Sequence, residues 1–160
     1  MININIICIG KLKEQFLRDA CAEYLKRLNS FCKISITELS AGKINDNPSP
    51  AEIESTLKEE GKKILEKVGS GEYVISMCIE GKQLSSRELA QTIENITLNH
   101  SGKIDFIIGG SYGLSEEVKN RSDLRLSMSK MTFPHQLARI MLLEQIYRQF
   151  MISNGGKYHK

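Results

Sequence analysis

The sequence has no tryptophan and only three prolines, and it contains no apolar run that approaches the length of a membrane span. A helix that crosses a bilayer needs roughly 18 or more consecutive apolar residues. The first residues also lack the basic segment and the small-residue cleavage site of a secretion signal. We therefore expect a cytoplasmic protein with no membrane partner. Its 160 residues, 41% hydrophobic and 26% charged, predict a single globular domain over residues 1–160.

Cysteine is scarce, and its spacing argues against a metal site. Cys8, Cys21, Cys32 and Cys78 form no CxxC pair, and no histidine stands at ligand spacing from them. Disulfide frameworks are typical of small secreted proteins, a class that this sequence does not resemble. We predict that the four thiols are small buried apolar groups, with neither a metal nor a disulfide.

Positive charge is modest overall but concentrated near the C-terminus. The net charge is +3, whereas residues 119–160 contain eight Lys or Arg against only Asp123 and Glu144. A basic region on an otherwise acidic chain favours a nucleic-acid partner, because neutralised phosphates release their counterions. An ordinary basic surface explains the same pattern, so charge alone leaves both interpretations open.

Apolar residues recur with the periods of alternating strands and helices. Residues 2–9 alternate Ile and Asn before a continuous apolar run, and residues 13–28 repeat apolar side chains at helical spacing. Capping-box patterns begin helices at Ser49 and Ser85. Strands are predicted at 2–9, 33–39, 73–79, 104–108 and 124–127, and helices at 13–28, 50–68, 85–96, 115–120 and 134–152.

This order of elements predicts the fold class. Parallel neighbours need crossover connections, so the pattern indicates an α/β fold with a mostly parallel sheet covered by helices on both faces. Ligands of such sheets bind at the carboxyl ends of the strands. The loops after the third, fourth and fifth strands are therefore the candidate site: residues 80–82, 109–114 and 128–133.

The loop after the fourth strand is rich in glycine. Gly109 and Gly110 lack Cβ atoms, which permits positive φ and lets backbone amides approach a ligand closely. The loop lacks the lysine of a P-loop, and it does not follow the first strand as a dinucleotide-binding fingerprint does. A tight strand-to-helix turn explains a lone glycine pair equally well.

The segment before the last predicted helix is more specific. Residues 128–135 read MSKMTFPH, and Pro134 suits a first helical turn, so unpaired N–H groups should point toward the glycine loop. A small ligand fits between the two segments. The alternative assigns Met128 and Met131 to core filling and Thr132 to an N-cap.

Motifs along the whole chain resemble one enzyme family. They include Gly10-Lys11, Gly81-Lys82, Gly109-Gly110 with Gly113-Leu114, Pro134-His135, Glu144-Gln145 and the final Tyr158-His159-Lys160. On these residues the sequence resembles the RlmH family of SPOUT methyltransferases. That family methylates N3 of a pseudouridine in 23S ribosomal RNA, of the position-1915 type, on the assembled ribosome.

The resemblance implies a C-terminal trefoil knot, a homodimer, and S-adenosyl-L-methionine as the cofactor. Carried over by position, the cofactor contacts are Met77, Gly109, Gly110, Met128, Ser129, Lys130, Met131, Thr132 and Phe133. Met77 and Met131 stand where some relatives have leucine, a volume-conserving difference that keeps an apolar wall. A homodimer also agrees with the last helix, whose apolar residues exceed a single stripe.

The resemblance also implies roles for residues near the C-terminus. His135, Tyr158 and His159 are the candidate catalytic residues, with the last two completing a site across the dimer. Arg139, Arg148 and Lys160 are the candidates for holding RNA phosphates. Pseudouridine N3 is a weakly acidic imide, so a base or a fixed positive charge would help to expose its lone pair. Local chemistry alone fits a structural role for His135 and a frayed end at His159, and the acceptor of the N3 proton stays open.

Three other functions share parts of the pattern. A non-catalytic ribosome- or RNA-binding module would use the same basic region, and a SPOUT methyltransferase acting on tRNA would share the cofactor site. The short chain, with no separate RNA-binding domain, disfavours a tRNA substrate. A nucleotide- or flavin-binding protein would share the sheet, but the phosphate motifs of such proteins are absent.

Overall fold

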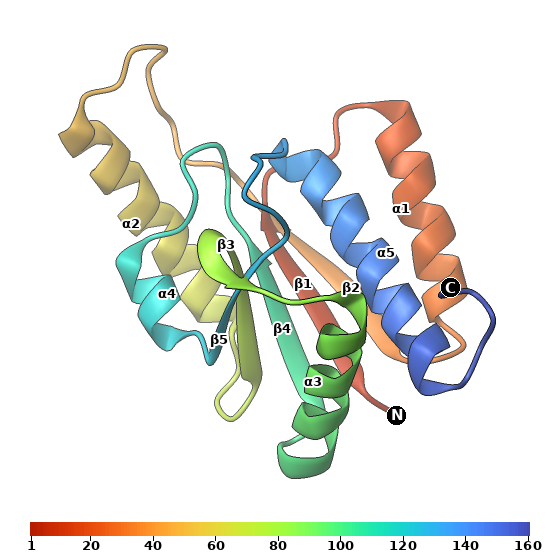
Figure 1. The fold of residues 1–160 in the computed structure, drawn as a ribbon. Coiled ribbons are helices and arrows are strands. Elements are labelled where there is room, and N and C mark those ends of the chain that lie inside the picture. The colour runs from red at the N-terminus through yellow and green to blue at the C-terminus, as the bar shows by residue number, and fades with distance from the viewer.

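The structure is a computed structural model that describes all 160 residues. Strands and helices alternate along the whole chain, as the sequence predicts (Figure 1). The elements are β1 (Asn3–Ile9), α1 (Gln15–Leu28), β2 (Lys33–Leu39), α2 (Pro50–Lys67), β3 (Tyr73–Gln83), α3 (Ser86–Asn99), β4 (Lys103–Ile108), α4 (Glu116–Arg121), β5 (Leu124–Ser127) and α5 (His135–Ser153).

The five strands form one parallel sheet in the order β2-β1-β4-β3-β5. At its centre, Ile6 of β1 stands opposite Phe106 of β4, and Ile7 stands opposite Ile107. All four side chains are fully buried. Strands covered on both faces need apolar residues at consecutive positions, which explains the unbroken apolar runs in the sequence. The predicted α/β fold with a parallel sheet is confirmed.

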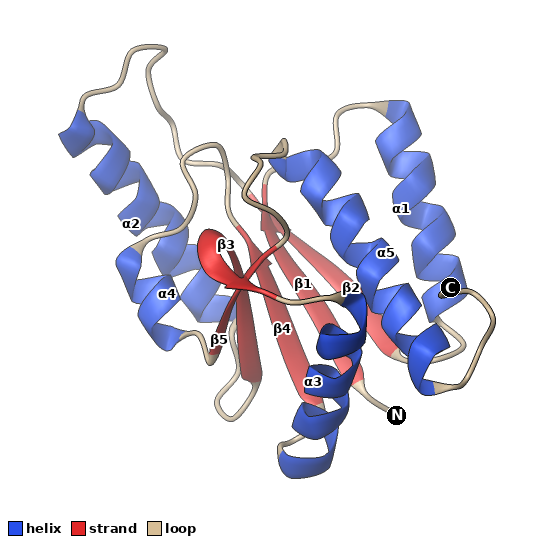
Figure 2. Ribbon diagram, in the orientation of Figure 1, coloured by secondary structure: helices blue, strands red, loops and turns tan.

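Helices cover both faces of the sheet: α1, α3 and α5 lie on one face, and α2 and α4 lie on the other (Figure 2). Successive strand residues point to opposite faces, so Ile6 belongs to the larger core with α1, α3 and α5, and Ile7 belongs to the smaller core with α2 and α4. The four cysteines are free and buried, as predicted.

The two predicted capping boxes begin helices α2 and α3. The Ser49 hydroxyl accepts from the N–H of Glu52 at 3.2 Å, and the Ser85 hydroxyl accepts from the N–H of Glu88 at 3.1 Å. Each glutamate side chain also accepts from the N-cap N–H. None of the helices combines the length and apolar character needed to cross a bilayer.

The third strand is longer than the sequence predicts. β3 extends to residue 83, whereas the apolar pattern predicted a strand ending at residue 79 followed by a loop. Met77 and Lys82 both pair with Leu126 of β5, so residues 78–81, here called the 78–81 loop, leave the ladder and return to it. A Cβ on Gly81 would lie 2.8 Å from backbone atoms of β5. Only glycine permits this close crossing, which apolar periodicity does not encode.

Candidate functional site

The carboxyl ends of β3, β4 and β5 meet at a cavity of about 150 Å³, here called the sheet-end cleft. Nearly all residues predicted to bind a cofactor line it: Met77, Gly109, Gly110, Met128, Ser129, Met131, Thr132 and Phe133. Lys130 is the exception, because its side chain is exposed and does not line the cleft. Sequence reasoning missed Cys78 and Ala138, which line the cleft among apolar positions that carry no distinguishing signal.

Backbone contacts shape the glycine loop at this cleft. A Cβ on Gly109 would collide with the carbonyl group of Gly113, and Gly113 has a φ of +86°. The N–H of Gly113 donates to the carbonyl oxygen of Gly110 at 3.1 Å, which closes a tight turn. The turn and the ligand site are therefore compatible interpretations, because the turn is what places bare backbone against the cleft.

Serine side chains hold the segment between β5 and α5 in shape. The Ser127 hydroxyl donates to the carbonyl oxygen of Ser129 at 3.0 Å, and the Ser129 hydroxyl accepts from the N–H of Met131 at 3.0 Å. Met131 is 75% exposed, so the alternative that it fills the core is wrong. Met128, in contrast, packs against the larger core while it also lines the cleft.

Helix α5 begins next to the cleft without a side-chain cap. Its N-cap is Pro134, and no side chain bonds to the first-turn N–H groups, so the alternative of a Thr132 cap is wrong. The first N–H groups of a helix have no partner within the helix. They favour a polar or negatively charged ligand atom at this end.

His135 is the only imidazole that lines the sheet-end cleft. Burial lowers the pKa of His135, and the positive charges of Arg139 and Lys13 lower it further. The ring is therefore mainly neutral at pH 7 and is able to accept a proton.

Arg139 lies inside the molecule. Its side chain is 2% exposed, its Nη1 lies 2.7 Å from Glu38 Oε2, and its Nη2 donates to the carbonyl oxygen of Gly10 at 3.1 Å. The prediction that Arg139 holds an RNA phosphate does not fit this position, because phosphate contact would break a buried ion pair. Counting charge along the sequence does not distinguish a buried arginine from an exposed one.

The C-terminal tail folds back on α5 around Glu144. We call Tyr24, Glu144, Arg148, Tyr158 and His159 the Glu144 cluster. The Glu144 carboxylate accepts from the hydroxyls of Tyr24 at 2.6 Å and Tyr158 at 2.9 Å, and it pairs with Arg148 at 2.6 Å. His159 Nδ1 lies 3.2 Å from Arg148 Nη1. Burial alone would raise the pKa of Glu144, but these hydrogen bonds outweigh it and lower the pKa.

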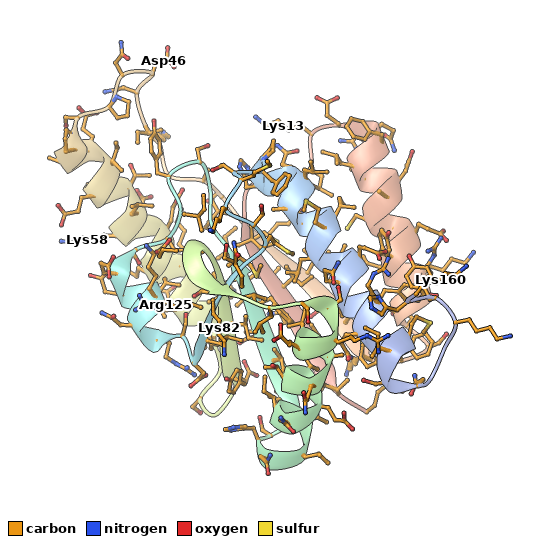
Figure 3. All side chains as sticks on the ribbon, in the orientation of Figure 1. Lys13, Asp46, Lys58, Lys82, Arg125 and Lys160 are labelled. Atoms are coloured by element: carbon orange, nitrogen blue, oxygen red, sulfur yellow. The ribbon has the colours of Figure 1, made fainter.

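The Glu144 cluster lies away from the cleft of its own chain. Along α5, Glu144 stands two and a half turns beyond His135, about 13 Å at the rise of an α-helix. The structure therefore gathers Tyr158, His159 and Arg148 at one place and His135 at another, and Lys160 is exposed at the chain end (Figure 3). A groove of about 470 Å³ between α3 and α5 contacts both places, because it is lined by Glu144 and by three cleft residues, Leu126, Ser127 and Met128.

A second cavity, of about 680 Å³, adjoins the cleft on the side of α4. It shares Gly110 and His135 with the cleft and adds Glu80, Tyr112 and Lys119. Sequence reasoning assigned no role to Tyr112, although an aromatic residue in a glycine loop was the available signal.

The lining of the sheet-end cleft fits the predicted cofactor. Met77, Ile108 and Leu126 offer apolar surface to a planar base, and the glycine loop offers backbone donors and acceptors. No Lys or Arg side chain lines the cleft, so its lining neither attracts phosphates nor repels a cationic sulfonium. S-adenosyl-L-methionine, a nucleoside without phosphate that carries a sulfonium, suits this donor set.

Known proteins resemble this chain over its whole length. Residues 2–159 match the family described as "Predicted SPOUT methyltransferase". A Clostridioides difficile (strain 630) protein named "Ribosomal RNA large subunit methyltransferase H" is 50% identical over 159 residues, which cover 99% of this chain and 100% of that protein. A protein of the same name from Oenococcus oeni is 46% identical over 160 residues and covers 100% of both chains.

The fold of this chain also resembles that of a solved structure, and this similarity shows the fold alone. A probable methylase family protein from Haemophilus influenzae Rd KW20 matches with a TM-score of 0.53 at 14% sequence identity. The match covers 98% of this chain and 70% of that one.

Proposed function

This chain belongs to the SPOUT methyltransferase family, and we propose that it methylates N3 of a pseudouridine in 23S ribosomal RNA on the assembled ribosome, with S-adenosyl-L-methionine as methyl donor. The sheet-end cleft carries this proposal, because it gathers nearly all the residues that the family resemblance assigns to the cofactor. The names of full-length relatives, at about half identity, support a large-subunit ribosomal RNA substrate. A protein that methylates RNA in ribosomes would be located in the cytoplasm.

The cofactor would be held by Met77, Gly109 and the 128–133 segment. When bound, S-adenosyl-L-methionine supplies a methyl group that its sulfonium already activates. The protein has to align the RNA nitrogen with that methyl group and exclude water, and good alignment alone lowers a barrier by several kcal/mol. The apolar wall and the glycine backbone described above are suited to this positioning.

His135 would take part in proton transfer. The N3 proton of pseudouridine has to leave when the new N–C bond forms, and a neutral imidazole at the cleft is able to accept it. Tyr158 and His159 would complete the site from the tail.

A homodimer is part of the proposal, because the tail does not reach the cleft of its own chain. A second copy would bring its Glu144 cluster to that cleft. Helix α5 also keeps apolar side chains at the surface: Leu137 is 38% exposed and Met141 is partly exposed. Pairing of two copies would cover these side chains.

Arg148 and Lys160 remain the proposed phosphate contacts, whereas Arg139 is left out because it is buried. Arg148 pairs with Glu144 at 2.6 Å beside Tyr158, so a phosphate would approach an arginine that is already oriented. Tyr158 is 39% exposed and offers a ring on which a base of the RNA would stack.

The crossing of the 78–81 loop and β5 supports the proposed trefoil knot. The loop passes directly over the backbone of β5 at Gly81, and the chain continues from β5 through the 128–133 segment into α5 (Figure 1). A knot needs such a loop, through which a later part of the chain passes.

A methyl-transfer assay with labelled S-adenosyl-L-methionine tests the proposed function. The substrates are ribosomes, free 23S ribosomal RNA and tRNA, from cells that lack this protein. We expect label in 23S ribosomal RNA, at one pseudouridine, when ribosomes are supplied. Label in tRNA would support the tRNA alternative. Absence of transfer, together with no heat on calorimetric titration with the donor, would support a non-catalytic binding module.

A further inference from the structure

The 78–81 loop forms one wall of the sheet-end cleft. Cys78 and Ile79 line the cleft, and residues 78–81 have no ladder partner between Met77 and Lys82, which both pair with Leu126. Its position therefore sets the shape of the cleft. Because Ile79 is 55% exposed, packing of that side chain does little to fix the loop.

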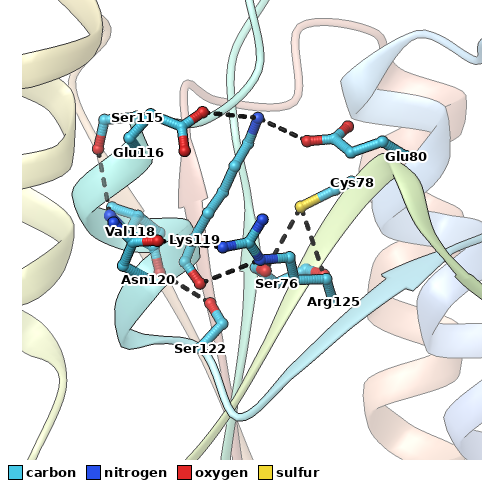
Figure 4. Close-up of polar contacts among 10 residues, drawn as sticks. All are labelled: Ser76, Cys78, Glu80, Ser115, Glu116, Val118, Lys119, Asn120, Ser122 and Arg125. Atoms are coloured by element: carbon cyan, nitrogen blue, oxygen red, sulfur yellow. Dashed lines mark hydrogen bonds and ion pairs between the residues drawn. The ribbon is translucent and has the colours of Figure 1, made fainter.

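A single ion pair ties this loop to another element. Glu80 Oε1 lies 2.6 Å from Lys119 Nζ of α4 (Figure 4). The other polar side-chain contacts of the loop join Cys78 Sγ to the Ser76 hydroxyl at 3.4 Å and to the Ser76 carbonyl oxygen at 3.8 Å, and both stay within β3. Glu80 and Lys119 both line the cavity that adjoins the cleft, so the pair lies beside the site.

Lys119 is held firmly enough to serve as an anchor. Its side chain is 18% exposed, and its carbonyl oxygen accepts from Arg125 Nε of β5 at 3.2 Å. The next residue toward the N-terminus, Val118, is fully buried. Hydrogen bonding between the pair raises the pKa of Lys119 and lowers the pKa of Glu80, so both groups are charged near neutral pH.

We propose that Glu80 and Lys119 are positioning residues that hold the 78–81 loop against the bound methyl donor and slow the donor's release. The inference rests on the proposed function of the cleft. Without the pair, the half-exposed Glu80 side chain would turn to water, and the loop would lose its ion pair with α4. Cys78 and Ile79 would then move, and the donor would escape faster. Changes of this kind act mainly on the dissociation rate.

The test uses Glu80→Gln, Lys119→Met and the double variant, with release of radiolabelled S-adenosyl-L-methionine as the readout. We expect each single variant to release the donor about fivefold faster, the size of effect that a partly buried ion pair gives. The double variant should be no faster than either single one, because all three remove the contact between Glu80 and Lys119, and the other ion pair of Lys119, with Glu116 at 3.8 Å, stays within α4. High salt should speed release from the wild type but not from the variants.

Lys58→Met is the matched control. It removes an exposed ion pair, at 3.4 Å, between Lys58 and Glu54 on α2, far from the cleft, and should leave release unchanged. Thermal melting checks that each variant is folded. If the melting temperature of Lys119→Met is low, the inference is tested by comparing the release rate of Glu80→Gln with that of the control.

Release rates equal to the wild type, or effects of the single variants that add in the double variant, would overturn the inference. Failure of the wild type to bind the donor at all would instead overturn the proposed function of the cleft.

Discussion

Gly109 stands where β4 ends and the chain turns back toward Gly113. A methyl group at this position would collide with the Gly113 carbonyl, so the loop would have to open. We expect Gly109→Ala to weaken binding of S-adenosyl-L-methionine about tenfold or more and to destabilise the fold by about 1–3 kcal/mol, the range found for overpacking. Calorimetric titration and urea unfolding measure the two effects. Ser111→Ala, on the exposed part of the same loop, is the control, and equal binding by both variants would contradict the assigned role.

A substitution at Arg139 distinguishes a structural role of this residue from contact with RNA. Removing one partner of a buried ion pair is strongly destabilising, and the partial exposure of Glu38 reduces the effect. We expect Arg139→Met to lower the free energy of unfolding by about 2–3 kcal/mol. Arg87→Met, at an exposed arginine without an ion pair, should change it little. Unchanged stability of Arg139→Met, with weaker ribosome binding, would restore the phosphate contact predicted from the sequence.

Asp105 makes the stability of the fold depend on pH. This residue of β4 is 3% exposed, and its Oδ2 has no hydrogen-bond partner. Burial first, and then Glu72, raise the pKa of Asp105 from 3.8 to about 7. The folded state therefore binds this proton more tightly than the unfolded state. Its contribution to stability is present in acid and is lost as the pH rises from about 4 to about 7.

Asp105→Asn should remove this dependence. We expect the variant to gain at least about 1 kcal/mol relative to the wild type at pH 8, and less at pH 5, because the carboxyl of the wild type is then largely protonated. Unfolding by urea at the two pH values measures the difference. Working at pH 5 and above avoids the opposing effect of Glu72, whose pKa is lowered. A constant difference across both pH values would show that Asp105 does not titrate in this range.

At the scale of elements, the sequence predicted best what local chemistry determines. Capping serines, apolar periods and turn glycines located every strand and helix, because each acts over a few residues. The return of β3 to β5 after the 78–81 loop depends on a tertiary crossing at Gly81, so apolar periodicity ended that strand too early. The burial of Arg139 escaped prediction for the same reason, since Glu38 is distant in sequence.

The tail is the element whose role the proposed mechanism tests most sharply. A chain that ends at Lys157 lacks Tyr158 and His159 but keeps the sheet-end cleft. We expect this truncation to bind S-adenosyl-L-methionine as the full chain does, while methyl transfer to ribosomes falls about 100-fold or more, the scale of a lost acid–base group. Lys160→Ala alone should cause a smaller loss. Full activity of the truncated chain would remove the tail from the mechanism.

At the scale of the whole molecule, one parallel sheet brings distant segments to one edge. Residues near 77, 109 and 130 meet because the carboxyl ends of parallel strands share an edge, which is why the order of strands in the sequence predicted the cleft. The position of the tail did not follow from this rule. That position depends on the packing of α1 against α5, where Tyr24 bonds to Glu144. The proposed role of the tail depends in addition on a second copy of the chain.

The most direct test of the account is mass mapping of 23S ribosomal RNA from a strain that lacks this protein. One pseudouridine should lose its methyl group, the wild-type chain should restore it, and Gly109→Ala should restore it poorly. If no pseudouridine loses a methyl group in the deletion strain, that result would contradict the proposed function.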